Sequence, residues 1–254
     1  MVFKRLLRLG QKGAQKTEPG TDWRKLVEKP CSSLLVGGFR PSGELTSSCF
    51  GEVRAARKGE IWPEYNGQAL WPVCQLNLLD APFVPDNLRD IAMLQVFVAE
   101  DYWSSDFVVT DSTEVNPTVP FFIRVYSTLE NLQSAQVPRH TSTFRPFEAR
   151  WNAEVQTDYP THDTMPIDFD ALGIGDYYEQ GGIDGVQATK LGGWPSCIQS
   201  EPWWDYRTQG KGFEYALQID SEEKAQCWWG DAGAVYIARH QSKKNLWAID
   251  SQCY

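Results

Sequence analysis

A block of short apolar runs occurs twice in this chain, and this repetition constrains the fold more than any other feature. In order, the first copy contains Phe50-Gly51, 61–65, Gly67 and 73–77, and the second contains Gly192-Gly193, 203–206, Gly210 and 216–220. Each copy passes from glycine through an aromatic-acid-tyrosine cluster to a glutamine between apolar residues, at near-equal spacing. We interpret the pattern as a diverged duplication that forms two similar halves of one structure.

The local pattern around these blocks is typical of strands and turns. From about Leu34 onward, short apolar or alternating runs are separated by Gly, Pro, Asn and Asp. Strands are predicted over 70–76, 92–99, 121–126, 214–219 and 234–238. A short helix is predicted from Thr21 or Asp22 to Val27, and a single turn over 86–90. The predicted fold class is α+β, mainly antiparallel β, in which two β-rich repeats form one compact domain with few short helices.

The chain divides into a basic tail over 1–20 and a single domain over 21–254. We expect one repeat half over about 45–130, an acidic connecting segment over about 146–188, and the second half over about 189–254. The tail combines Lys4, Arg5 and Arg8 with apolar residues, so it is either a solvated tail or a short amphipathic helix for a membrane surface or a partner. The connecting segment is predicted to be a solvated crossing with one or two short helices, or else a rim that attracts cations.

Charge and cysteine content limit the partners and the compartment. The net charge is −9 and the sequence pI is about 4.9, which disfavours binding to nucleic acid and favours a protein partner with a basic surface. No apolar stretch is long enough for a secretory signal or a membrane span, so no stable membrane insertion is expected. The six cysteines form no C-x-x-C pair, and we expect reduced thiols in a cytoplasmic protein.

Three motifs in the second half carry a resemblance to a known family. They are Lys190–Gln199 with Gly192-Gly193-Trp194-Pro195, Leu217–Ser221, and Trp229–Tyr236 with Gly230-Asp231-Ala232-Gly233. In this order they resemble the signatures of the YwqG-like family, a domain family of unknown function, over about residues 186–240. Residues 72–77 resemble the family's first-half motif more weakly. The resemblance implies a mixed, mainly antiparallel β architecture with few helices, and it implies no established activity.

Two carboxylates are the candidates for catalysis. Asp231 lies between glycines, where it is either the internal cap of a structural turn or a group that opens into a cleft. Asp220 takes the repeat position that Asn77 holds in the first half. If Asp220 and Asp231 converge, the pair could perform acid/base chemistry or bind a hard cation. The histidines are isolated and no nucleotide-binding fingerprint occurs, so neither a metal site nor a cofactor is predicted.

Amide and indole side chains are the candidates for ligand binding. The set comprises Gln75, Asn77, Gln199, Trp203, Gln218 and Trp229. A buried amide requires hydrogen-bond partners, so the glutamines either form a structural network between the two halves or line a pocket. The tryptophans around the second half form either core or a stacking groove for carbohydrate or peptide.

Two functions of different classes follow from these observations. The acidic charge, the aromatic content and the lack of a catalytic constellation favour a non-enzymatic binding or protein-interaction module, with an immunity-type inhibitor as one variety. The alternative is a hydrolase-type enzyme that uses the Asp220 and Asp231 pair in a cleft between the two halves.

Overall fold

Strands make up most of the structure. The computed structural model describes residues 24–102, 107–139, 142–160, 185–199, 202 and 212–254. In chain order its elements are α2 (Arg24–Val27), β1 (Lys29–Val36), β2 (Cys49–Phe50), β3 (Ala55–Arg57), β4 (Glu64–Tyr65), β5 (Gln68–Ala69), β6 (Trp71–Asn77), η1 (Leu78–Asp80), η2 (Asp86–Leu88), β7 (Met93–Val98), β8 (Phe107–Asp111), β9 (Phe121–Tyr126), β10 (Leu132–Ser134), β11 (Phe147–Trp151), β12 (Gln156–Asp158), β13 (Lys190–Gly192), β14 (Phe213–Asp220), β15 (Ala234–His240) and β16 (Leu246–Gln252). All five predicted strands are present, and the predicted helical turns correspond to α2 and η2.

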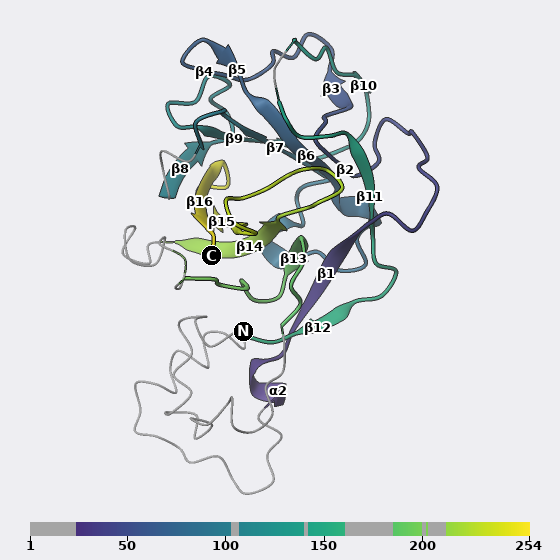
Figure 1. Cartoon of the computed structure of the whole chain (residues 1–254), viewed down its shortest axis with the longest axis vertical. Helices are drawn as coiled ribbons and strands as arrows, with labels where there is room; N and C mark the ends of the chain where they lie inside the picture. The colour runs from purple at the N-terminus through teal and green to yellow at the C-terminus, as the bar shows by residue number, and fades with distance from the viewer. Residues whose placement is uncertain (1–23, 103–106, 140–141, 161–184, 200–201, 203–211) are drawn as a thin grey trace, which may run out of the picture.

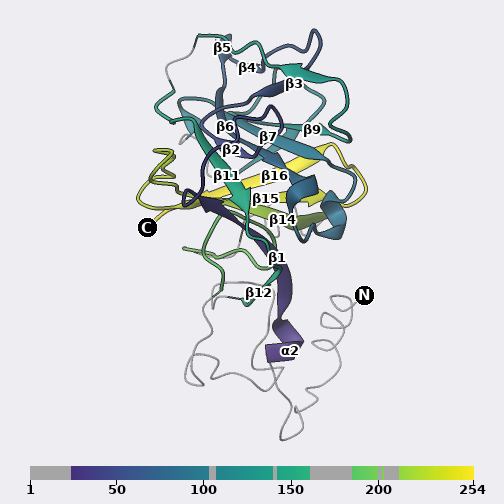
Figure 2. The same ribbon diagram turned by 90° about the vertical axis from the view of Figure 1, so that its right-hand side faces the viewer.

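One large antiparallel sheet organises these strands. Its order is β8-β16-β15-β14-β13-β1-β11-β2-β6-β7-β9, and β12 pairs with β1 beside this path. The sheet curls until β6, β7 and β9 lie across β14, β15 and β16, as Figure 2 shows, which gives a nearly closed, barrel-like shape (Figure 1). The mainly antiparallel β fold with little helix is therefore confirmed.

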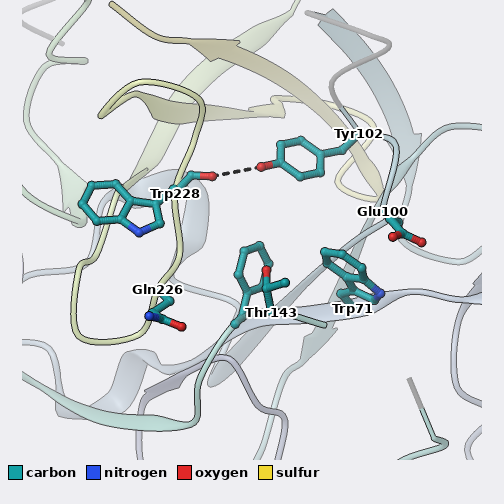
Figure 3. A pocket seen from close by; sticks show the side chains of 7 residues that line it. Trp71, Glu100, Tyr102, Thr143, Gln226 and Trp228 are labelled. Atoms are coloured by element: carbon teal, nitrogen blue, oxygen red, sulfur yellow. Dashed lines mark hydrogen bonds between the residues drawn. The ribbon is translucent and has the colours of Figure 1, made fainter. Parts of the chain in front are cut away.

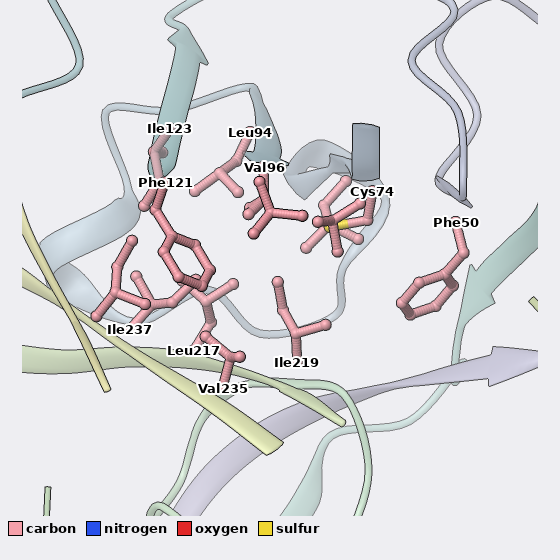
Figure 4. Close-up of a cluster of buried hydrophobic side chains, with 14 of the residues drawn as sticks. Phe50, Cys74, Leu94, Val96, Phe121, Ile123, Leu217, Ile219, Val235 and Ile237 are labelled. Carbon is pink, nitrogen blue, oxygen red and sulfur yellow. The ribbon is translucent and has the colours of Figure 1, made fainter. Parts of the chain in front are cut away.

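The core lies between the two crossed ends of the sheet. Figure 4 shows side chains from both ends facing one another across this space. Leu94, Val96 and Ile123 come from β7 and β9, whereas Leu217 and Val235 come from β14 and β15, and all five are fully buried. Because each strand set has an apolar inner face, curling the sheet buries the apolar faces of the two sets against each other.

The strands of the two halves are arranged alike on either side of β1 and β11. The order β2-β6-β7-β9 on one side corresponds to β13-β14-β15-β16 on the other. Gln75 of β6 lies opposite Cys49, and Gln218 of β14 lies opposite Lys190. Both β6 and β14 carry a bulge that ends one residue before this glutamine. This is the arrangement that the predicted duplication requires, although the duplication itself stays a prediction.

The two glutamines make corresponding hydrogen bonds inside their own halves. The Gln75 side-chain oxygen accepts from the backbone N–H of Ala55 at 3.0 Å, and that of Gln218 accepts from the backbone N–H of Ser196 at 2.9 Å. Each amide thereby holds the loop that follows the neighbouring strand, β2 or β13. The predicted network between the halves is wrong, because each glutamine bonds within its own half.

Strand register also corrects the matching of the repeat glycines. The sequence pattern matches Gly51 with Gly193, but Phe50 pairs with Cys74 of β6 and Leu191 pairs with Leu217 of β14. Gly51 therefore corresponds to Gly192, and the two have φ values of 67° and 69°. Left-handed backbone of this kind favours glycine, which explains the first glycine of each copy.

The acidic connecting segment is not a solvated crossing over its described beginning. β11 and β12 lie within it and pair with β1. Glu148 is buried and accepts from Arg54 at 3.0 Å, and Asp158 is also fully buried. The prediction of a solvated crossing is wrong here, because these two carboxylates are paired inside the sheet. Residues 161–184, like the basic tail over 1–20, lie outside the described residues.

Among the described residues, no helix has the length and apolar character needed to cross a membrane.

Candidate functional site

A partly open cavity of about 360 Å³ lies beside the core, and we call it the aromatic pocket. It is lined by Trp71, Glu100, Tyr102, Thr143, Phe144, Gln226 and Trp228. These residues come from the start of β6, the segment after β7, the segment before β11 and the loop between β14 and β15. Figure 3 shows them surrounding one space, with aromatic rings on several sides. Curling of the sheet brings the four segments together.

The inner wall of the aromatic pocket consists of packed rings. Trp71, Tyr102 and Phe144 are each less than a tenth exposed. Trp71 meets Phe144 edge to face, with ring centroids 5.9 Å apart and an angle of 85° between the planes. Behind them Trp229 contacts both Tyr102 and Phe144. This packing fixes the ring positions, so the wall is formed before any ligand arrives.

The rim combines one exposed indole with polar groups. Trp228 is 44% exposed, and its backbone carbonyl accepts a hydrogen bond of 2.9 Å from the Tyr102 hydroxyl (Figure 3). Glu100, Thr143 and Gln226 are exposed beside it and bring a carboxylate, a hydroxyl and an amide. None of the seven lining residues is basic, so the pocket presents aromatic faces and a single negative charge.

The loop that carries Trp228 is held by a dense set of hydrogen bonds. Glu222 and Cys227 form an isolated bridge across its turn. The Ser221 hydroxyl accepts from the backbone N–H of Trp229 at 3.0 Å and donates to the carbonyl of Gly233 at 2.9 Å. A Cβ at Gly233 would collide with backbone atoms of Gln252 and Trp229, so only glycine fits. The loop therefore presents Trp228 in a defined position.

Comparison with known families now identifies the chain. Residues 49–245 match the family described as Domain of unknown function (DUF1963). The chain belongs to this family. The matched region includes all seven residues of the aromatic pocket, and the YwqG-like resemblance stays a prediction. No curated protein matches the chain.

The two carboxylates predicted for catalysis are not among the residues that line the aromatic pocket of this DUF1963 protein. Asp220 is half-buried at the end of β14, where its carboxylate accepts from the backbone N–H of Ser221 and burial raises its pKa. Asp231 is exposed, and no hydrogen bond from the described residues reaches its carboxylate. The turn is held by the hydrogen bond from the Ser221 hydroxyl to the Gly233 carbonyl and by the one from the Gly233 N–H to the Trp229 carbonyl. These bonds take the place of the predicted Asp231 cap. Neither aspartate lines the pocket.

The predicted ligand-binding amides have structural partners or lie elsewhere. Asn77 caps η1 by accepting from the backbone N–H of Leu79 and by donating to Asp80. Gln199 is exposed and donates to the carbonyl of Cys253 at 2.6 Å. Gln75 and Gln218 are buried, and their side chains make the hydrogen bonds to the loops after β2 and β13 that are described above. Trp203 lies outside the described residues.

The Gly-Gly-Trp-Pro motif surrounds a buried ion pair. The Lys190 ammonium lies 2.8 Å from Asp158, and both side chains are fully buried. The Asp158 carboxylate also accepts from the backbone N–H of Trp194 at 2.8 Å. A Cβ at Gly193 would collide with this carboxylate, and the residue has φ +69°. The close approach of the Gly193-Trp194 backbone to the Asp158 carboxylate therefore determines the conformation of this motif.

Among the described residues, metal-ligating side chains do not cluster and most thiols are buried. No group of three or more His, Cys, Asp or Glu residues among them could hold a metal ion. All six cysteines are free thiols, and all of them except Cys253 are buried. Burial is the main cause that raises the pKa of Cys31 to about 12, and it also raises the pKa values of Cys49, Cys74 and Cys227. Thiolate nucleophiles are disfavoured at these positions.

Thiol titration checks this assignment. We expect a disulfide reagent to modify Cys253 rapidly in the native protein, and the five buried thiols only after denaturation, because the thiolate is the reacting species. The rate is followed by absorbance of the released thiol, and Cys253→Ser is expected to abolish the rapid phase. A rapid phase that survives this substitution would contradict the assignment.

Most of the pocket residues could not be selected from the sequence. Only Trp228 stands in the tryptophan cluster that the sequence indicates, and Glu100, Tyr102 and Gln226 occupy no motif. Their proximity depends on the closure of the sheet, which brings together segments distant in the chain. The tight turn before Trp228, with Gln226 at φ 49°, likewise has no glycine or asparagine to signal it.

Proposed function

We propose that this chain is a non-enzymatic protein-interaction module that binds a protein partner at the aromatic pocket. The observation that carries the proposal is Trp228, a 44% exposed indole on a braced loop at the rim of a preformed cavity. Tryptophans dominate the energetics of many interfaces, and a wall that is already ordered loses little entropy on binding. An immunity-type inhibitor of a basic partner is one form that such a module could take.

The pocket supports binding more than hydrolysis. A hydrolytic site needs a general base or nucleophile beside the space that holds the substrate. Asp220 and Asp231 do not line the pocket, and Glu100 is the one acidic residue among the seven that do. The hydrolase that uses the two aspartates stays the alternative hypothesis, and no contact in the described residues favours it.

A proposed duplication accounts for where the pocket lies. The strand order, the paired bulges and the glutamine bonds support two related halves. Trp71 and Tyr102 come from the first half, whereas Gln226 and Trp228 come from the second. In this proposal the pocket belongs to the contact between the halves, where a duplicated chain has room to diverge.

Replacing Trp228 tests the proposed function. The full chain and its Trp228→Ala variant are immobilised and exposed to extract from the source cells, and the retained proteins are quantified by mass spectrometry. We expect a specific partner to be retained by the native chain and its recovery to fall at least tenfold with Trp228→Ala, since truncating a hot-spot residue costs about 2 kcal/mol or more.

Ile61→Ala is the matched control. Ile61 is 69% exposed and does not line the pocket, so its substitution removes an exposed apolar side chain elsewhere and is expected to leave recovery unchanged. Equal melting temperatures would show that all three proteins are folded. A partner retained equally by the Trp228→Ala variant would overturn the proposed function.

A further inference from the structure

We propose that the aromatic pocket receives the guanidinium group of an arginine side chain presented by the protein partner. This inference rests on the proposed function and deepens it by naming the chemistry that the pocket recognises. It follows from the lining: aromatic rings supply the walls, Glu100 supplies a negative charge at the rim, and none of the seven residues is positively charged.

The rings provide what a planar cation needs. Trp71 and Phe144 stand nearly perpendicular, at 85°, and Trp228 lines the pocket from the opposite loop (Figure 3). The negative faces of aromatic rings attract cations, and tryptophan does so most strongly. Guanidinium is favoured over ammonium because it is planar and weakly hydrated, so it stacks on indole and loses less solvation.

Glu100 gives the pocket a directional partner for this cation. A carboxylate accepts two parallel hydrogen bonds from guanidinium, which neutral ligands cannot supply in the same form. Asp101, the next residue, is exposed, and so is Glu223 in the turn that leads to Gln226. These charges add to an overall net charge of −9 and attract basic partners toward this part of the surface.

Lys224 and Arg145 are the cations within two residues of the described lining, and neither lines the pocket. The Lys224 ammonium is held by the carbonyl of Val36 at 2.5 Å, so its charge is directed to the end of β1. Arg145 is exposed and follows Phe144, and its backbone N–H donates to Ala225. Among the described residues that line the cavity, no basic group competes with an incoming arginine.

The cavity volume suits an arginine side chain. At about 360 Å³ the space is larger than a guanidinium group alone. The three-carbon stem of arginine can therefore lie along the indole of Trp228 while the head group reaches the inner rings. Apolar contact with the stem and charge contact with the head then act together.

A pair of isosteric probes tests the inference in the full chain. N-acetyl-arginine methylamide and N-acetyl-citrulline methylamide have nearly the same shape, but only the first carries charge. Binding is measured by NMR from the indole N–H signals of Trp71 and Trp228, assigned with Trp→Phe variants. We expect the arginine probe to shift these signals and the citrulline probe to bind about tenfold more weakly.

Substitution of the carboxylate gives the second comparison. We expect Glu100→Gln to weaken the arginine probe by about five- to tenfold, and Glu130→Gln, which changes an exposed acid outside the pocket, to leave its affinity within about twofold. Equal binding of the two probes, or arginine binding unaffected by Glu100→Gln, would overturn the inference. So would cellobiose shifting the same indole signals when the arginine probe does not.

The outcome is separable from that of the proposed function. A partner lost with Trp228→Ala but accompanied by no arginine binding would leave the interaction module standing and reject the guanidinium site. Arginine binding without any Trp228-dependent partner would reject the protein-interaction role while the guanidinium site stands.

Discussion

Replacing Asp158 by Asn is expected to lower the free energy of unfolding by about 3–5 kcal/mol. The carboxylate is fully buried and accepts four hydrogen bonds, from the Lys190 ammonium and from the backbone N–H groups of Tyr159, Val186 and Trp194. An asparagine amide would point a donor at other donors and would leave the Lys190 charge buried without its counter-ion. Urea unfolding followed by tryptophan fluorescence measures the loss.

The exposed pair of Asp86 and Arg89 provides the control. These side chains are 87% and 68% exposed and lie 2.8 Å apart. Because water and salt screen such a pair, Asp86→Asn is expected to cost less than about 1 kcal/mol. Equal losses for the two substitutions would show that the Asp158 environment contributes no more than a surface ion pair.

Three of the strands that the sequence predicts correctly contain few polar residues. β6, β7 and β9 read as short apolar runs and are buried along almost their whole length. β1 is different, because Ser32 and Ser33 make it look like a polar connection. Both are buried in the structure, and the Ser32 hydroxyl exchanges hydrogen bonds with the backbone of Phe83. A partner so distant in the chain leaves no local signal.

The same physical reason separates the family motifs from the candidate site. Glycine is required at 193 by the close approach of Asp158, and at 233 by the close approach of backbone atoms. Both motifs are therefore explained by packing inside the protein. The sequence could indicate that such residues matter, but it could not distinguish a close approach inside the protein from one to a ligand. Asp158 occupies no motif, although it dictates the conformation of one.

The aromatic pocket illustrates the complementary difficulty. Nothing in the sequence distinguishes Trp228 from its neighbour Trp229, yet Trp228 is 44% exposed and Trp229 only 1%. Trp229 packs against Tyr102, Phe121 and Phe144, whereas Trp228 lies at the rim of the pocket. Only the fold shows that Trp229 supports the wall from behind while Trp228 meets the solvent. The candidate ligand-binding residue Trp229 is thus placed in the core.

Trp229→Ala is accordingly expected to destabilise the protein by about 3–5 kcal/mol. Its ring stacks with Phe121 at 6.4 Å and 27° and meets Tyr102 edge to face at 5.3 Å. Removal of the indole would leave a cavity behind the pocket wall that the surrounding strands can fill only in part. Urea unfolding gives the loss of stability, and the indole signals of Trp71 and Trp228 report the disturbance of the pocket.

Trp229→Phe separates ring packing from hydrogen bonding. Among the described residues the indole N–H of Trp229 has no hydrogen-bond partner, so phenylalanine keeps an aromatic ring and removes a buried donor that gains nothing in the fold. We expect this variant to retain most of the stability that alanine loses. A loss as large as that of Trp229→Ala would show that the full indole ring, or a partner for its N–H, is required. That result would also mean that the wall of the aromatic pocket depends on the shape of this one side chain.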